Sequence, residues 1–470
     1  MLTADEIEEG LAGHLVAAWG YTPGAAYQRV VVDSRQASGG DLFVALAGEH
    51  LDGHDFITEA VERGAAGVLA QRPPQGLAEG VAIFQVTDTL FALQLLARRR
   101  LAQNLVKVIA ITGSVGKTTC KELTAAVLSR RYAVLGSQAN LNSEVGLPIS
   151  LLELTPGHQR AVLEMAMYQR GDIRFLCEMT RPQIGVVTNV GPSHMERLGS
   201  LEAIALAKAE LPESLPSNGF AILNGDDPLA AAMAQRTSAG VILYGTSPGC
   251  TVRAEDVASH GLEGISFRLR LGRRQAPVRL PLPGRHNLHN ALAAAAVALA
   301  DGMPLAEVAE ALSAAPVPSR IRVAPGHNGS TIIDDTYNAS PASMLAALDL
   351  LKEMPGRAIA FLGDMRELGP YHYEGHRHVG QRAAQVADVI YAVGEGGGIV
   401  GQAAREVGHP MVRFFADKET AAQALRQRLR PGDFVLVKAS RAMAFETVVE
   451  HLQGVDCHAE RSEASQAGWQ

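Results

Sequence analysis

The feature that most constrains the fold is a glycine-rich loop between a strand-like run and a helix-like run. Residues 106–112 read VKVIAIT, an apolar run typical of a strand buried in a parallel sheet. A short loop follows directly and leads into the helix-forming segment CKELTAAVLSR; it consists of Gly113, Ser114, Val115, Gly116, Lys117, Thr118 and Thr119. Strand, loop, Lys-Thr pair and helix in this order form a short variant of the P-loop. The chain therefore has to contain a parallel α/β sheet.

This loop predicts a nucleoside triphosphate site. Its glycines let successive backbone N–H groups face phosphate oxygens, and the following helix adds the positive end of its dipole. We expect Lys117 on the β- and γ-phosphates and the Thr118 hydroxyl on Mg²⁺. The alternative is a Gly-rich turn without a ligand, which the joint occurrence of all four parts disfavours.

Two later strand-like runs end in residues that could serve a metal. AVLE ends at Glu164, and the segment TNVGPSHMERLG carries Asn189 and His194. Because parallel strands end at one edge of a sheet, Glu164 and His194 could converge with the P-loop on one or two metal ions. Read alone, Glu164 is a strand-end surface residue and His194 a loop residue with a local hydrogen bond.

Composition restricts the class of protein. At 470 residues, 47% hydrophobic and 19% charged, the chain is expected to form two to four globular domains. A net charge of −7 disfavours a nucleic-acid partner or an acidic lipid surface, but it leaves a local pocket for an anionic substrate open. The four cysteines form no CxxC pair, the N-terminus has no signal-peptide pattern, and the most apolar run, Ala291–Ala300, is about half a membrane span. We expect a reduced, soluble, cytoplasmic protein.

The order of apolar runs predicts three α/β domains. Short strands and helices fill residues 1–102, the P-loop begins the larger domain 103–316, and strands alternate with helices again over 317–454. The Pro-rich stretch Ala315–Pro325 marks the second boundary, and the polar residues 455–470 are expected to form a disordered tail.

In addition to the pattern of apolar runs, the chain carries an ordered set of sequence motifs over about residues 3 to 453. They include VVVDSRQASGGDLFVALAGEHLDGHDF, ITGSVGKTTCKEL, NLNSEVGLPISLL, EMAMYQRGDI, TNVGPSHMERLGS, AKAEL, LNGDD, LPGRHNLHNALAAAAVA, IIDDTYNASPASM, FLGDMRELG and VLVKASRAMAFE. With these motifs the chain resembles the Mur ligase family, the ATP-dependent amide ligases that build the peptide stem of peptidoglycan. The resemblance implies a small UDP-binding α/β domain, a central P-loop ATPase domain with a parallel sheet, and a C-terminal Rossmann-like α/β domain.

The resemblance also implies substrates and an activity. Within the family it is strongest to the ligases that join D-alanyl-D-alanine to UDP-N-acetylmuramoyl-tripeptide through an acyl phosphate, releasing ADP and phosphate. The implied partners are these small molecules, with ATP and two Mg²⁺ ions; the implied protein is a monomer.

Residue roles carry over position by position. The UDP-sugar site corresponds to Ser34, Arg35, Asp52, Gly53, His54 and Asp55. The metal ligands correspond to Thr118, Glu164, His194 and Lys208, of which Lys208 matches a lysine that CO₂ carbamylates. The nucleotide contacts correspond to the loop Gly113–Thr119, Asn290 near adenine, and Arg320 and Asp335 near phosphates and ribose. The docking site of the incoming amine corresponds to Asn338, Ser340, Lys438, Ser440 and Arg441. The sequence departs from the common family pattern at Ser143, Tyr168 and Gln169.

Several competing readings remain at this stage. Within the same chemistry, the rivals are the ligase that adds the third stem residue, marked by a DNPR motif where this chain has DDTYNASP, and folylpolyglutamate synthase, which lacks the first domain. A P-loop kinase or nucleotide switch would leave residues 1–102 unexplained. A non-catalytic homologue is disfavoured by the intact Lys117, Thr118, Glu164, His194 and Lys208.

Overall fold

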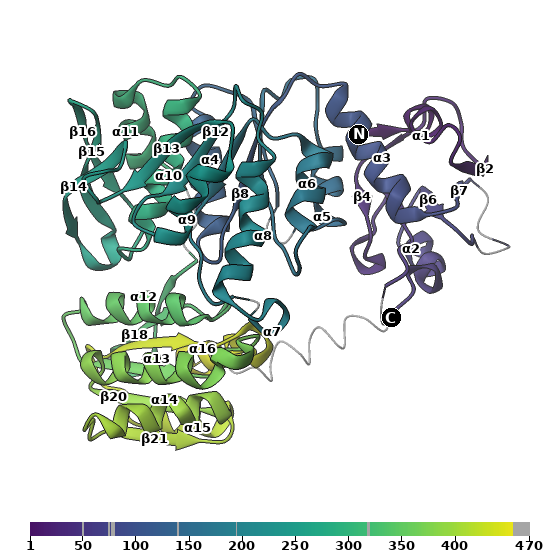
Figure 1. The fold of residues 1–470 in the computed structure, drawn as a ribbon. Helices are drawn as coiled ribbons and strands as arrows, with labels where there is room; N and C mark the ends of the chain where they lie inside the picture. The colour runs from purple at the N-terminus through teal and green to yellow at the C-terminus, as the bar shows by residue number, and fades with distance from the viewer. Residues whose placement is uncertain are drawn as a thin grey trace.

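The protein folds into three α/β domains, each built on its own sheet (Figure 1). The computed structural model describes residues 1–48, 51–73, 76, 80–138, 141–193, 195–316 and 320–454. The expected boundaries after residues 102 and 316 leave each sheet whole. The predicted tail, residues 455–470, and the predicted metal ligand His194 lie outside the described residues.

The N-terminal domain holds a five-stranded sheet that is parallel except at one edge. Its strands, in spatial order, are β2 (Leu15–Trp19), β7 (Ala82–Val86), β6 (Gly67–Ala70), β5 (Leu42–Val44) and β4 (Val30–Val31). Only β2 runs antiparallel to its neighbour. The other elements are β1 (Leu2–Thr3) paired with β3 (Ala26–Tyr27), helices α1 (Ala4–Gly10), α2 (Ile57–Glu62) and α3 (Thr89–Ala102), and the 3₁₀ turns η1 (Ser34–Gln36) and η2 (Gly53–Phe56).

The central domain carries a nine-stranded sheet in which the P-loop strand lies inside. The spatial order is β16 (Arg274–Leu280), β15 (Ile265–Leu271), β14 (Val252–Ser259), β13 (Gly240–Gly245), β12 (Phe220–Asn224), β11 (Ile184–Val187), β8 (Lys107–Thr112), β10 (Arg160–Glu164) and β9 (Val134–Gly136). Because β8, β10, β11 and β12 are parallel, their carboxyl ends share one edge.

Helices cover both faces of this sheet, as buried apolar strands require. They are α4 (Lys117–Leu128), α5 (Gly146–Leu152), α6 (Asp172–Thr180), α7 (Met195–Leu198), α8 (Leu201–Glu213), α9 (Pro228–Ala232), α10 (Asn287–Ala300) and α11 (Leu305–Ser313), with 3₁₀ turns η3 (Met233–Arg236) and η4 (Gly261–Glu263). The Ala-rich α10 packs against α4, and small side chains allow that close approach.

One part of the central sheet differs from the predicted parallel arrangement. Strands β14, β15 and β16 form an antiparallel extension at its edge. Their buried positions alternate with exposed ones, as in β15, where Ile265, Phe267 and Leu269 face the core. This alternation is typical of a sheet with one solvated face.

The C-terminal domain has a six-stranded sheet. The spatial order is β17 (Arg322–Pro325), β18 (Thr331–Asp334), β22 (Phe434–Lys438), β19 (Ala358–Leu362), β20 (Val389–Val393) and β21 (Val412–Phe415), and only the β17–β18 pair is antiparallel. Helices are α12 (Pro341–Lys352), α13 (His372–Val386), α14 (Gly394–Glu406), α15 (Lys418–Arg426) and α16 (Glu446–Gln453), with turns η5 (His327–Gly329), η6 (Gly369–Tyr371) and η7 (Arg441–Met443). The predicted fold class is confirmed.

The C-terminal domain contacts the central domain at several places, and two of them lie outside the glycine-rich loop. Glu353, which follows α12, accepts hydrogen bonds from Ser259 and from Arg285 Nε, the latter at 3.2 Å. At the other place η6 packs against α7: a Cβ on Gly369 would lie 2.7 Å from Glu196 Cα. The two domains are therefore in direct contact at each of these places.

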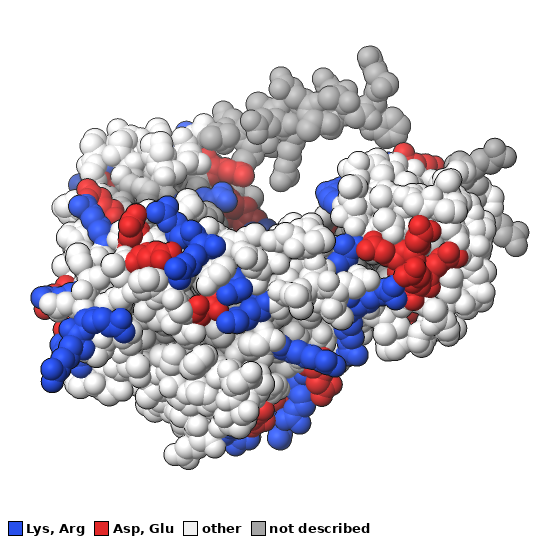
Figure 2. All heavy atoms as spheres, turned by 90° about the horizontal axis from the view of Figure 1, so that it is seen from above, with Lys and Arg blue, Asp and Glu red and all other residues white. Residues whose placement is uncertain are grey.

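Charge is distributed in small groups of both signs over the face drawn in Figure 2. Exposed ion pairs between the described residues include Arg130–Glu310 and Arg279–Glu263. Over the described ranges, no helix is long and apolar enough to cross a bilayer.

Candidate active site

The glycine-rich loop lies where the sequence predicts it, between β8 and α4. Gly113 and Gly116 have φ values of +149° and +86°, which glycine adopts without strain. A Cβ on Gly116 would lie 2.5 Å from Asn290 Oδ1, so α10 packs directly on the loop. Lys117 folds back and donates from Nζ to the Gly113 carbonyl at 2.9 Å. The loop conformation thus depends on glycine at these positions.

The segment after β11 fixes the backbone of this loop. Asn189 Oδ1 accepts the Val115 N–H at 3.0 Å, and its Nδ2 donates to the Val115 carbonyl at 2.8 Å. The Thr188 hydroxyl donates to the same carbonyl at 2.7 Å, and the Ser114 hydroxyl donates to the Gly191 carbonyl at 3.0 Å. Asn189, which the sequence marked as a strand-end candidate, therefore holds the phosphate loop.

Glu164 lies at the end of β10, beside the loop. It is 5% exposed, so the reading as a surface residue is wrong. One carboxylate oxygen accepts the Thr118 hydroxyl at 2.7 Å and the other accepts Asn142 Nδ2 at 2.9 Å. The hydroxyl and the carboxylate are oxygen donors of the kind that Mg²⁺ prefers.

Lys208 enters the same region from α8 and is only 2% exposed. Burial, followed by the neighbouring Lys117 ammonium, holds the pKa of Lys208 well below its usual range. Burial also lowers the pKa of Lys117. In the described part of the chain, no carboxylate forms an ion pair with the Lys208 amine. This edge of the sheet therefore favours anionic groups, and it favours a neutral Lys208 amine.

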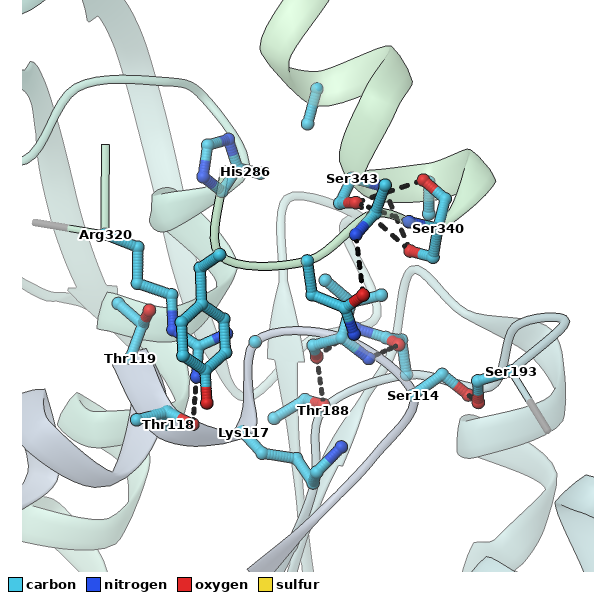
Figure 3. A pocket seen from close by; sticks show the side chains of 18 of the residues that line it. Ser114, Lys117, Thr118, Thr119, Thr188, Ser193, His286, Arg320, Ser340 and Ser343 are labelled. Atoms are coloured by element: carbon cyan, nitrogen blue, oxygen red, sulfur yellow. Dashed lines mark hydrogen bonds between the residues drawn. The ribbon is translucent and has the colours of Figure 1, made fainter. Parts of the chain in front are cut away.

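The C-terminal domain reaches the loop through Arg320. Its guanidinium donates to the Thr118 hydroxyl and lies 4.5 Å from the centroid of the Tyr337 ring. Figure 3 shows Arg320 pointing toward Thr118. A positive charge from a second domain is thereby placed at the position predicted for the metal and phosphates.

The residues predicted for the amine substrate lie on one wall of the C-terminal domain. Lys438 Nζ pairs with Asp335 Oδ2 at 2.6 Å and donates to the Asn338 carbonyl at 2.8 Å. Ser340 caps α12 in a reciprocal arrangement with Ser343, visible in Figure 3. These bonds order the wall before any substrate binds.

A single cavity of about 900 Å³ joins the loop to this wall. Of the predicted residues, those lining it are Ser114, Val115, Gly116, Lys117, Thr118, Thr119, Glu164, Asn290, Arg320, Asp335, Asn338, Ser340, Lys438, Ser440 and Arg441. Lys208 is buried and is not among the lining residues. The glycine-rich loop and the polar wall of the C-terminal domain thus line the same cavity.

The predicted UDP-sugar residues form a separate group in the N-terminal domain. They lie on η1 and η2, apart from Asp52, which caps η2, and the two turns follow the parallel strands β4 and β5. His54 Nδ1 bonds Asp52 Oδ1 at 2.6 Å, and the backbone N–H of His54, with its ring, lowers the pKa of Asp52. Ser34 donates to Glu59 at 2.9 Å, while Arg35 pairs with Asp33. None of the six residues lines the cavity described above.

Sequence reasoning missed part of the cavity wall. Arg366, Glu367 and Leu368 line it, from the loop that follows β19. The motif FLGDMRELG contains them, but no rule of spacing marks its residues as ligands. Asn224 and His289 also line the cavity. The only sequence feature that could have marked them is the polar segment around each, LNGDD for Asn224 and GRHNLHN for His289. Of the three departures from the family pattern, Tyr168 lines the cavity.

Family models match the chain in three consecutive segments. They are the Mur ligase family catalytic domain over residues 26–100, the Mur ligase middle domain over 111–298, and the Mur ligase glutamate ligase domain over 319–441. Each matched segment lies within a different one of the three domains.

Individual relatives match over most of their length. The UDP-N-acetylmuramoyl-tripeptide–D-alanyl-D-alanine ligase of Synechocystis is 40% identical, covering 90% of this chain and 91% of that protein. The ligase of the same name from Escherichia coli is 37% identical, covering 90% and 93%. Among solved structures, MurF from Acinetobacter baumannii matches with a TM-score of 0.85 at 32% identity, covering 96% and 98%. MurF ligase from Thermotoga maritima in complex with ADP matches with a TM-score of 0.77 at 32% identity, covering 91% and 97%. The chain belongs to the Mur ligase family.

Proposed function

We propose that the chain joins D-alanyl-D-alanine to UDP-N-acetylmuramoyl-tripeptide, converting ATP to ADP and phosphate in peptidoglycan precursor synthesis. The observation that carries this proposal is the single cavity shared by the phosphate loop and the polar wall of the C-terminal domain. A kinase needs the phosphate loop but not the polar wall. The high-coverage relatives named for this reaction support the same assignment.

In the first step, the terminal carboxylate of the tripeptide attacks the γ-phosphorus of ATP, and ADP leaves. The backbone N–H groups of the loop, Lys117 and Arg320 stabilise negative charge on the transferring phosphoryl group. The product is an acyl phosphate. We assign adenine to Asn290 and the ribose to Asp335, and the shared cavity that both residues line supports this assignment.

Mg²⁺ fits the oxygen donors at the sheet edge. Thr118 and Glu164 would hold it, together with His194 and a carbamylated Lys208, which would form when the neutral amine takes up CO₂. Carbamylation turns a buried cation into an anionic oxygen donor, and the lowered pKa of Lys208 favours the neutral amine it requires. When bound, two such ions would neutralise charge during phosphoryl transfer.

In the second step, the free amine of D-alanyl-D-alanine attacks the acyl carbon. A tetrahedral intermediate forms and collapses, phosphate leaves, and the amine loses a proton as the amide forms. Asn338, Ser340, Lys438, Ser440 and Arg441 are proposed to position the dipeptide. The C-terminal domain supplies one wall of the cavity, and in this proposal that wall limits the access of water, which would hydrolyse the acyl phosphate.

The rest of the substrate binds elsewhere. We assign the UDP-sugar to Ser34, Arg35, Asp52, Gly53, His54 and Asp55, at the carboxyl ends of two parallel strands. The chain acts as a monomer in this proposal, since one chain supplies both walls of the cavity. ATP and UDP-linked sugars are made in the cytoplasm, which is where we place the reaction.

Phosphate release tests this function. Purified protein receives Mg-ATP and UDP-N-acetylmuramoyl-tripeptide, with and without D-alanyl-D-alanine, and the nucleotide product is weighed by mass spectrometry. Release that requires both substrates, with a product heavier by the dipeptide less water, is expected. Release that ignores the dipeptide would instead favour a kinase or a nucleotide switch.

A further inference from the structure

Helix α4 buries a lysine one turn beyond the phosphate loop. The Lys121 side chain is only 1% exposed, and its Nζ pairs with Glu122 Oε1 at 2.6 Å. The same Nζ donates a hydrogen bond to the carbonyl of Ser137, the residue that follows β9. Lysine is almost never fully buried unless it is paired, because taking an ammonium out of water costs free energy. The Lys121 ammonium therefore attaches α4 to the end of β9.

Ser137 in turn holds the backbone of Glu164. Strand β9 ends at Gly136, opposite Val162 of β10, so the pairing of the two strands stops before Glu164. The Ser137 hydroxyl accepts the Glu164 N–H at 3.1 Å, and the Ser137 N–H donates to the Val162 carbonyl at 3.0 Å. A buried N–H without an acceptor costs free energy. Ser137 thus supplies, with a side-chain oxygen, the acceptor that the last position of β10 needs.

The backbone on the other side of Glu164 is fixed by β8. The Met165 N–H donates to the Ile111 carbonyl at 2.8 Å, and the Thr112 hydroxyl donates to the Met165 carbonyl at 3.0 Å. The end of β10 is therefore held from both sides. The Glu164 carboxylate keeps only the freedom of its own side-chain torsions, and the two hydrogen bonds that it accepts restrict these.

Helix α4 reaches Glu164 by two routes. Thr118, in the first turn of the helix, donates directly to the Glu164 carboxylate. Lys121, three residues later, reaches the Glu164 backbone through Ser137. Neither Lys121 nor Ser137 lines the cavity, so neither is placed to touch a substrate. Their contacts instead fix where β10 ends relative to the start of α4.

We propose that Lys121 and Ser137 are positioning residues for Mg²⁺ binding, because they hold the Glu164 carboxylate beside the Thr118 hydroxyl. The inference rests on the proposed function, which assigns Mg²⁺ to these two oxygen donors. Neither positioning residue is assigned a bond to the ion or to the nucleotide. Loss of either one should therefore weaken the effect of Mg²⁺ on nucleotide binding more than it weakens nucleotide binding itself.

Binding of ADP with and without Mg²⁺ tests this role. Isothermal titration calorimetry on the full-length protein gives the Kd of ADP in EDTA and the Kd in saturating Mg²⁺. The ratio of the two constants reports the contribution of Mg²⁺, because a change that affects ADP alone cancels. In Lys121→Met the ratio should fall about threefold or more. Ser137→Ala keeps the carbonyl but removes the acceptor of the Glu164 N–H, and it should lower the ratio as well.

Asp301→Ala is the matched structural control. Asp301 binds Lys107 and Arg160 at the opposite ends of the same two strands, β8 and β10. Its loss should destabilise these strands without a contact to the site, so the ratio should change less than about twofold. Circular dichroism gives the Tm of each variant, and all titrations are made below the lowest Tm, so that folded proteins are compared.

The outcomes distinguish this inference from the proposed function. An unchanged ratio in a folded variant would overturn the role of the residue replaced, and an equal fall in Asp301→Ala would overturn both roles. Where Lys121→Met does not fold, the ratio of Ser137→Ala decides. A wild-type ratio of one would overturn the Mg²⁺ assignment and this inference with it. Wild-type protein with a Mg²⁺-dependent ratio but no dipeptide-dependent phosphate release would overturn the ligase reaction and leave the positioning roles standing.

Discussion

Arg320 donates a hydrogen bond to the Thr118 hydroxyl, so a residue at the start of the C-terminal domain touches the phosphate loop of the central one. Arg320→Ala should reduce kcat/KM for ATP about 10- to 100-fold, because a charged hydrogen-bond donor is lost at the developing phosphoryl charge. Steady-state kinetics with varied ATP measures this. Arg322→Ala, two residues away and exposed on β17, serves as control, and an equal loss in both variants would contradict the assignment.

Lys208 should make activity depend on CO₂. Only a neutral amine forms a carbamate, and the lowered pKa of Lys208 means that this form persists to lower pH than in an exposed lysine. Activity should fall in CO₂-depleted buffer, fall further as pH decreases, and return with bicarbonate. Lys208→Ala should be inactive at every bicarbonate concentration. A wild-type rate indifferent to CO₂ would argue against carbamylation, and Lys352→Ala controls for loss of a lysine.

Asp301 should matter for stability and not for catalysis. Its fully buried carboxylate binds Lys107 Nζ and Arg160 Nε, each at 2.6 Å, at the amino-terminal ends of β8 and β10. Asp301→Ala should cost about 2–3 kcal/mol, below the full cost of breaking a buried pair because Lys107 is partly exposed. Urea denaturation measures the loss. Asp349→Ala, which breaks an exposed ion pair with Arg382, should cost less than about 1 kcal/mol.

Asp226 should contribute to acid sensitivity. Burial raises its pKa, but hydrogen bonds from Ser247, Thr246 and His289 outweigh burial and leave the pKa below its usual value. The folded carboxylate then binds a proton less readily than the unfolded one. Its stabilisation is complete above about pH 4 and is lost as pH falls toward the folded pKa.

The variant Asp226→Asn tests whether the stabilisation by Asp226 is lost as the pH falls. Its Tm should lie below that of the wild type at pH 7, and the difference should shrink as pH is lowered from about 5 to 3. Thermal unfolding followed by circular dichroism at several pH values measures both. A difference that grows in acid would contradict the assigned direction.

The local parts of the site could be predicted from sequence, and the parts made by packing could not. Gly113–Thr119 lies between adjacent elements, so the strand, turn and helix patterns place it directly. Lys208, by contrast, looks like any solvated helix lysine; its burial depends on packing between α8 and the sheet. The position of Glu367 depends on α13, α14 and Ser440, whose approach to one loop leaves no periodic signal in the sequence.

The strands of the central sheet illustrate the same limit. β8, β10, β11 and β12 are continuous apolar runs and could be found from sequence. β14, β15 and β16 mix charged and apolar residues at alternating positions, so a search for continuous apolar runs passes over them.

The predicted UDP-sugar residues and the cavity lie in different domains, so the proposed substrate has to span the distance between the two sites. In the proposed reaction, the nucleotide of the precursor is anchored at Asp52 and His54 in one domain, and the γ-phosphate lies beside Lys117 in another. Such a precursor would reach the γ-phosphate only through the length of its peptide. Each residue of extended peptide spans about 3.5 Å, so a precursor one residue short stops about that far from the reacting atom. Separation of the two sites can therefore check that earlier additions are complete before the last one is made.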